Sequence, residues 1–193
     1  GPRFDLQTAA SYVAEGTARL SRGDESGAER AFHHATRLDP GHAPAFFSLG
    51  VLQYRMGKVR SASEAYRKTL ALDPDHRDAQ YNFGHTLKKL GDVVGAEQAF
   101  RRSIELEPKR ARAYNNLGGL YFEAEQLDSA IAIYRRCIGN NAGNANTHAN
   151  LGAALRSKLL SDEAIVELRK AISLQPNHFS AHYQLAHTLR DLS

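Results

Sequence analysis

The chain has 193 residues, with 25 Lys and Arg against 21 Asp and Glu, a net charge of +4, and 24% charged residues, an ordinary balance for a soluble chain. No apolar run approaches the roughly 18 residues that a membrane-spanning helix needs, so we expect no membrane span. A single cysteine excludes an intramolecular disulfide framework, and it fits a reducing compartment, so we expect a cytoplasmic protein.

The chain begins with a short segment outside the pattern that follows. Gly1 and Pro2 look like the remnant of a cleaved tag, and we interpret 1–8 as this remnant and an N-terminal lead-in, with the natural N-terminus absent. From residue 9 onward, apolar residues recur at spacings of three and four, which predicts amphipathic helices. Prolines that end helices recur at a constant interval, at Pro40, Pro74, Pro108 and, two intervals later, Pro176.

Three further registers share this period. A small residue recurs in the first helix of each unit, at Gly16, Gly50, Gly84, Gly118, Gly152 and Ala186. An alanine recurs in the second helix, at Ala28, Ala62, Ala96, Ala130 and Ala164, and a large residue follows it at Phe32, Tyr66, Phe100, Tyr134 and Leu168. We therefore expect two helices per unit that approach closely at the small residue, where the second helix presents Ala130 and, four residues later, the aromatic Tyr134.

The turns between the two helices of each unit differ along the chain. Gly23, Gly57 and Gly91 stand where a left-handed residue is needed to end the first helix. Glu125 and Leu159 hold the same position in the fourth and fifth units. We expect these two turns to be strained or differently closed.

This pattern is identified as that of the tetratricopeptide repeat (TPR) family, whose repeat is about 34 residues long. The resemblance covers nearly the whole chain and implies an all-α fold, a right-handed α-solenoid of helix-turn-helix repeats. It divides the chain into five repeats, 9–42, 43–76, 77–110, 111–144 and 145–178. The last segment, 179–193, is an extra helix, either the first helix of a sixth repeat or a cap. Because Ala186 keeps the small residue that faces a second helix, we expect a longer array and a tendency to self-associate end to end.

The resemblance also implies a function in protein–protein interaction. Asn82, Asn116 and Asn150 lie two residues before successive small residues, on the first helices that line the concave side of a TPR array. They resemble the asparagine ladder of O-GlcNAc transferase-type TPR arrays, which implies bidentate hydrogen bonds to the backbone of an extended peptide. A primary amide suits this role because it both donates and accepts. The alternative is that these amides bond a neighbouring helix.

The flanking concave positions mix aromatic and polar groups, as recognition surfaces do. They are Phe47, Tyr54, Tyr81, His85, Lys88, Lys89, Arg112, Asn115, Phe122 and Tyr183. We therefore predict a non-catalytic module that binds an extended peptide or disordered segment of a protein partner. Two other interpretations stay open: a substrate-recruiting arm of a larger enzyme such as a glycosyltransferase, and a self-assembling scaffold.

Other chemistries find less support in the sequence. His178 and His182 have the spacing of two metal ligands but lack any confirming motif, and Cys137 occupies a small packing position, so we expect no metal, cofactor or catalytic residue. Basic pairs near the ends of the second helices could follow a phosphate backbone, yet acidic residues on the same helices dilute the charge, so nucleic-acid binding is not expected. The chaperone-binding clamp pattern fails because its Lys positions hold other residues.

Overall fold

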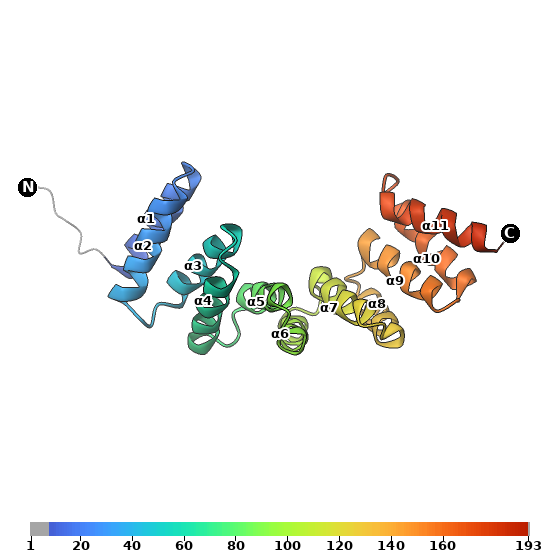
Figure 1. Cartoon of the computed structure of the whole chain (residues 1–193), viewed down its shortest axis with the longest axis horizontal. Helices are drawn as coiled ribbons and strands as arrows, with labels where there is room; N and C mark the ends of the chain where they lie inside the picture. The colour runs from blue at the N-terminus through green and yellow to red at the C-terminus, as the bar shows by residue number, and fades with distance from the viewer. Residues whose placement is uncertain (1–7, 193) are drawn as a thin grey trace, which may run out of the picture. The chain divides into compact units, whose positions relative to one another are not determined.

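The computed structural model describes residues 8–192, in which the chain forms eleven α-helices and no strand (Figure 1). Odd-numbered helices begin at residues 9, 43, 77, 111, 145 and 179, a constant interval that equals the spacing of the prolines. The all-α prediction is thereby confirmed, while the division into repeats stays a prediction. The helices are α1 (Ala9–Ser21), α2 (Glu25–Leu38), α3 (Ala43–Arg55), α4 (Val59–Leu72), α5 (Arg77–Leu90), α6 (Val93–Leu106), α7 (Ala111–Glu123), α8 (Leu127–Gly139), α9 (Ala145–Ser157), α10 (Ser161–Leu174) and α11 (Phe179–Asp191).

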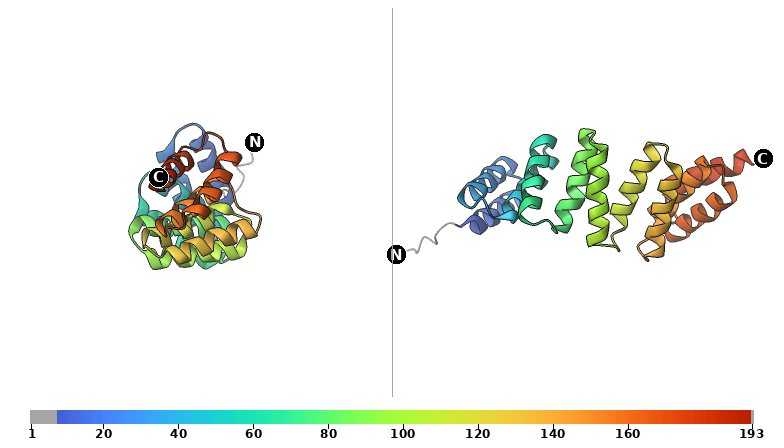
Figure 2. Two further views of the ribbon diagram at one scale, coloured as in Figure 1. Left: turned by 90° about the vertical axis from the view of Figure 1, so that its right-hand side faces the viewer. Right: turned by 90° about the horizontal axis from the view of Figure 1, so that it is seen from below.

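The helices belong to two compact units, one ending at Ala99 and the other beginning at Phe100, so that the boundary falls within α6. In unit 1, α1 packs on α2 and α3 packs on α4, and α2 and α4 each pack on the helix that follows (Figure 2). In unit 2, α7 packs on α8 and α9 on α10, and α8 and α10 likewise each pack on the following helix. The helices named here therefore pack against their neighbours in the sequence, as in repeat proteins.

The small residues of the first helices pack against the large residue of the second helix. A Cβ placed on Gly118 would lie 2.5 Å from Cζ of Tyr134, and one on Gly50 would lie 2.9 Å from Cε1 of Tyr66. Ala130, one turn before Tyr134, is fully buried, and at Gly152 the equivalent Ala164 supplies a backbone oxygen 3.3 Å from the added Cβ. The ring needs the volume that a side chain would take, which is why the position is a glycine.

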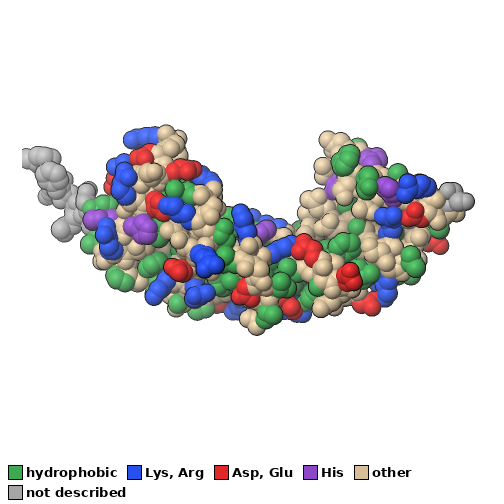
Figure 3. Space-filling model, in the orientation of Figure 1, with side chains coloured by type: hydrophobic (Ala, Val, Ile, Leu, Met, Phe, Trp, Pro, Cys, Tyr) green, Lys and Arg blue, Asp and Glu red, His purple; other side chains and the backbone are tan. Residues whose placement is uncertain are grey.

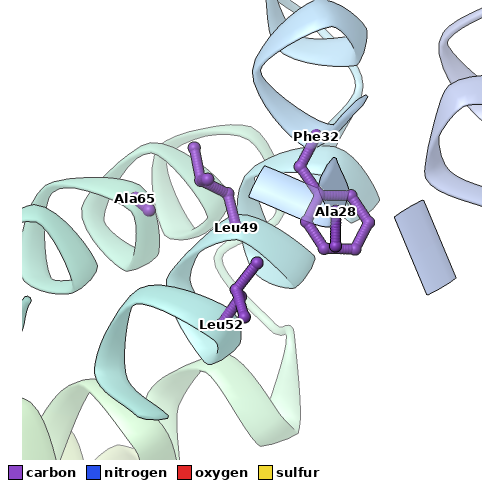
Figure 4. Packing of buried hydrophobic residues seen from close by; sticks show 5 residues of the cluster. All are labelled: Ala28, Phe32, Leu49, Leu52 and Ala65. Atoms are coloured by element: carbon purple, nitrogen blue, oxygen red, sulfur yellow. The ribbon is translucent and has the colours of Figure 1, made fainter. Parts of the chain in front are cut away.

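The core of unit 1 gathers residues from α2, α3 and α4. Phe32 and Leu52 are each 1% exposed, and they pack with Ala28, Leu49 and Ala65 (Figure 4). The alanines let the helix backbones approach, and the larger side chains fill the space between them. This core fixes the packing of α3 and α4, two helices that also contribute residues to the candidate site described in the next subsection.

Helix α5 has signals at both ends that fix its bounds. At its beginning, Nδ1 of His76 accepts a hydrogen bond from the Ala79 backbone N–H at 3.2 Å. At its end, Gly91 has a φ of 81°, which a side chain would strain. Lys88 and Lys89 lie in the last turn, where cations interact favourably with the helix dipole. The last turn of α5 therefore presents positive charge at a fixed position.

The two turns without glycine are strained, as predicted. Glu125 has a φ of 58° and Leu159 a φ of 63°, both in the left-handed region. For an L-amino acid, this conformation costs roughly 1–2 kcal/mol of free energy, a cost that the achiral glycine avoids. The turns at Glu125 and Leu159 therefore keep the left-handed backbone of the glycine turns although no glycine is present.

Candidate functional site

A pocket of about 550 Å³ is formed in unit 1 by residues of the first helices α3 and α5 and of the second helix α4 between them in the sequence. Four of its seven residues belong to the predicted recognition surface. We call it the α3–α5 pocket, and it is lined by Val51, Tyr54 and Arg55 of α3, Tyr66 of α4, and Asn82, His85 and Lys89 of α5. Its volume lies within the roughly 300–1,000 Å³ typical of ligand sites.

Lys89 and Tyr54 form a cation–π pair across this pocket. The Lys89 Nζ lies 5.1 Å from the centre of the Tyr54 ring. Tyr54 is half-buried, whereas Lys89 is exposed. Within residues 8–192, no hydrogen bond or ion pair joins Lys89 to a carboxylate. The ring therefore positions the ammonium group without neutralising it.

Asn82 and Tyr66 form a polar pair in the wall of the pocket. Burial raises the pKa of Tyr66, and a hydrogen bond from the Asn82 side chain opposes the rise. Because burial is the larger effect, the phenol keeps its own proton at neutral pH. The alternative role for the asparagine, bonding to a neighbouring helix, therefore applies to Asn82.

His85 and Tyr81 interact one helical turn apart on α5. The two rings lie edge to face with centroids 5.0 Å apart, and His85 Nε2 is 3.0 Å from the Tyr81 hydroxyl. His85 lines the pocket and Tyr81 does not. Tyr81 thereby orients a pocket residue.

Phe47 is mainly a packing residue in this structure. It is half-buried in a cluster with Tyr66, and its ring lies 4.5 Å from that of His76. Lys88, the remaining predicted residue of unit 1, is half-buried and lies outside the pocket lining. Neither residue is placed at the pocket.

The other six predicted residues lie in unit 2, on α7, α9 and α11. Asn116 uses its amide within its own helix, donating from Nδ2 to the Arg112 backbone oxygen at 2.9 Å. Asn115 has a buried Oδ1 that lacks a hydrogen-bond partner among the residues that the structure describes. The amide of Asn150 and the ring of Phe122 are half-buried. Tyr183 is 53% exposed and stacks on Phe179 at 6.3 Å.

Sequence reasoning missed three residues of the pocket, namely Val51, Arg55 and Tyr66. Val51 and Arg55 stand one repeat period before His85 and Lys89, so the repeat itself carried the signal. Tyr66 was assigned only a packing role, because its register also supplies the ring against Gly50. The Tyr66 side chain therefore both packs against Gly50 and lines the pocket.

His148, His178 and Cys137 have structural partners, and that of Cys137 is the Thr147 hydroxyl at 3.8 Å. His148 Nδ1 lies 2.6 Å from a Glu167 carboxylate oxygen, and His178 Nδ1 accepts the Ala181 N–H at 3.2 Å. Burial raises the pKa of the Cys137 thiol. In the described part of the chain, no group of three or more His, Cys, Asp or Glu side chains is placed to hold a metal ion.

Charges of both signs are mixed over the surface. Figure 3 shows acidic side chains among the Lys and Arg on the visible face. Ion pairs join the repeats within each unit, for example Lys58 with Glu29 at 2.7 Å and Arg135 with Glu163 at 2.6 Å. None of the helices between residues 8 and 192 has both the length and the apolar character needed to span a membrane.

Paired helices that recur at a constant interval, with a small residue packed against a large one, define an α-solenoid repeat protein. One tetratricopeptide repeat family model matches residues 50–106 and 81–145, and a second matches 145–178. The chain therefore belongs to the tetratricopeptide repeat family. Neither model is that of a catalytic family.

Solved structures of TPR proteins share this fold. A MamA protein is 28% identical, with a TM-score of 0.80 over 87% of this chain and 92% of its own. MamA from Desulfovibrio magneticus RS-1 is 24% identical, with a TM-score of 0.78 over 89% of this chain and 97% of its own. YrrB, described as a TPR protein with an unusual peptide-binding site, is 24% identical, with a TM-score of 0.77 over 91% of this chain and 90% of its own. No curated protein matches the sequence.

Proposed function

We propose that this chain is a non-catalytic recognition module that binds an extended segment of a protein partner across α3 and α5. The α3–α5 pocket carries the proposal, because it gathers Tyr54, Asn82, His85 and Lys89 from two first helices. An aromatic wall with a few polar groups is the usual lining of a binding site. YrrB supports the proposal only through its fold, so the argument depends on the residues of this chain.

Asn82 supplies the contact to the backbone of the bound segment. A primary amide both donates and accepts, so the half of the Asn82 amide that Tyr66 does not engage can bond to a peptide unit. The bond to Tyr66 also orients the amide. A pre-oriented amide loses less side-chain entropy on binding than a free one. In unit 2, we assign to Asn150 the same role of hydrogen bonding to the backbone of the bound segment.

The proposal also assigns no catalytic step to the chain. A nucleophile needs a lowered pKa or an adjacent base, whereas burial raises the pKa of Cys137. His148 and His178 are buried and hydrogen-bonded to Glu167 and Asn146. These residues have packing and capping roles that account for them.

Peptide selection on the purified protein tests the function. Peptides selected from a random library are measured by fluorescence anisotropy against wild type, Val51→Arg and Leu72→Arg. Val51 lines the pocket and is 40% exposed, while Leu72 ends α4 outside it and is 43% exposed, so the two variants carry the same change on equally accessible surfaces. We expect Val51→Arg to weaken binding at least about tenfold, because the new side chain fills the pocket. Equal affinities for the two variants would place the binding site elsewhere.

A further inference from the structure

The α3–α5 pocket has an unbalanced charge. Arg55 and Lys89 line it from α3 and α5, and His85 lies one turn before Lys89, whereas no Asp or Glu belongs to the lining among the residues that the structure describes. Arg55 is already paired with Glu25 of α2 at 2.8 Å. Lys89 has the Tyr54 ring as its partner. The positive charge of Lys89 is therefore available to a ligand.

Unit 2 contains the same helix positions with the charge neutralised. Three repeat periods after Tyr54 and Lys89 stand Arg156 and Asp191. Arg156 Nη2 lies 2.8 Å from the Asp191 carboxylate, and its hydrogen bond lowers the pKa of that carboxyl. Arg156 also contacts Gln184, the counterpart of Asn82, at 3.3 Å. The protein thus closes this space with its own ion pair in unit 2 and leaves the equivalent space in unit 1 positive.

The series of equivalent positions shows that the cation is specific to this pocket. One position of the first helix reads Ser21, Arg55, Lys89, Glu123, Ser157 and Asp191 along the chain. It carries a positive charge only in α3 and α5, and both of these residues line the pocket. Basic residues also stand in the last turns of α1, α9 and α11, where they complement the helix dipole. What distinguishes α3 and α5 is that their cations line one pocket from two sides, which favours a local ligand of negative charge.

We propose that the α3–α5 pocket binds the phosphoryl group of a phosphorylated side chain in the partner segment, an inference that rests on the proposed peptide-binding function. A phosphoryl group carries a charge of about −1.5 to −2 and three strong acceptor oxygens. The pocket offers it the Lys89 ammonium, and the Arg55 guanidinium adds positive charge at the other side although it is paired with Glu25. A carboxylate carries a charge of about −1 and only two acceptor oxygens, so the positive pocket attracts it less strongly.

Titration of the isotope-labelled full chain with three capped heptapeptides tests the proposal by NMR. Each peptide has three glycines on either side of a central phosphoserine, glutamate or serine. We expect the phosphoserine peptide to bind at least about tenfold more tightly than the other two, because its phosphoryl group carries more charge and more acceptor oxygens than a carboxylate or a hydroxyl. The amide shifts should be largest at 51–55 and 82–89.

Two variants with the same loss of charge in unit 1 provide the matched control. Lys89→Ala should weaken phosphoserine binding at least about fivefold, whereas Lys68→Ala, an exposed residue of α4 outside the pocket, should change it less than twofold. Equal binding of the three peptides at the pocket would overturn the phosphoryl assignment and leave peptide binding intact. Equal loss in both variants would show that only general charge attraction is involved, and the absence of any shift at the pocket would overturn the assignment too.

Discussion

Two adjacent glycines of α7 provide an internal test of the helix contact. A Cβ on Gly118 would lie 2.5 Å from Cζ of Tyr134, which is 2% exposed, whereas a Cβ on Gly119 would meet nothing within 4 Å. Both substitutions to alanine gain about 0.8–1 kcal/mol of helix propensity. Only Gly118→Ala also overpacks the core, at a typical cost of about 1–3 kcal/mol. Subtracting one variant from the other removes the shared propensity gain and leaves the packing cost.

Urea unfolding followed by far-UV circular dichroism measures this difference. We expect Gly119→Ala to be more stable than wild type by up to about 1 kcal/mol, and Gly118→Ala to lie about 1–3 kcal/mol below Gly119→Ala. The ring of Tyr134 is buried in a close-packed core, so it cannot move away without disturbing its neighbours. Stabilities of the two variants within about 0.5 kcal/mol of each other would refute the close contact between Gly118 and the ring.

Three further predictions concern single side chains. Asn82→Ala should lower the free energy of unfolding by about 0.5–1.5 kcal/mol through loss of the bond to Tyr66, while Asn150→Ala should change it by less than about 0.5 kcal/mol in the same urea assay. Leu159→Gly should raise the melting temperature, because it relieves a φ of 63° at an exposed position; an unchanged or lower value would contradict the strain. The Cys137 thiol, buried and with its pKa raised, should react with a thiol reagent only after urea unfolding, and rapid reaction of the folded protein would contradict its burial.

The repeat period made most of the fold predictable. Helix boundaries follow from residues that recur once in every period, and the prediction of strain at Glu125 and Leu159 followed from the absence of glycine there. The nearest partner of Gly118 was not predictable from the pattern, since Ala130 and Tyr134 lie one turn apart on the same helix face. Choosing between them requires the depth at which the two helices pack, and only the structure supplies it.

The candidate site could be predicted only in part, for a similar reason. The sequence identified Tyr54, Asn82, His85 and Lys89 as surface groups of first helices, and they do line one pocket. It did not reveal that the amide of Asn82 is bonded to Tyr66, because the depth of that phenol depends on packing between α4 and α5. Asn82 is therefore both a structural and a recognition residue in this account.

The most direct test of the account is a crystal structure of the chain with a selected peptide bound. We predict that the peptide lies across α3 and α5, with one side chain in the α3–α5 pocket and its backbone hydrogen-bonded to the side-chain amide of Asn82. Lys89 should contact the inserted side chain directly. A peptide bound on the second helices α2 and α4, with the pocket empty, would contradict the central claim.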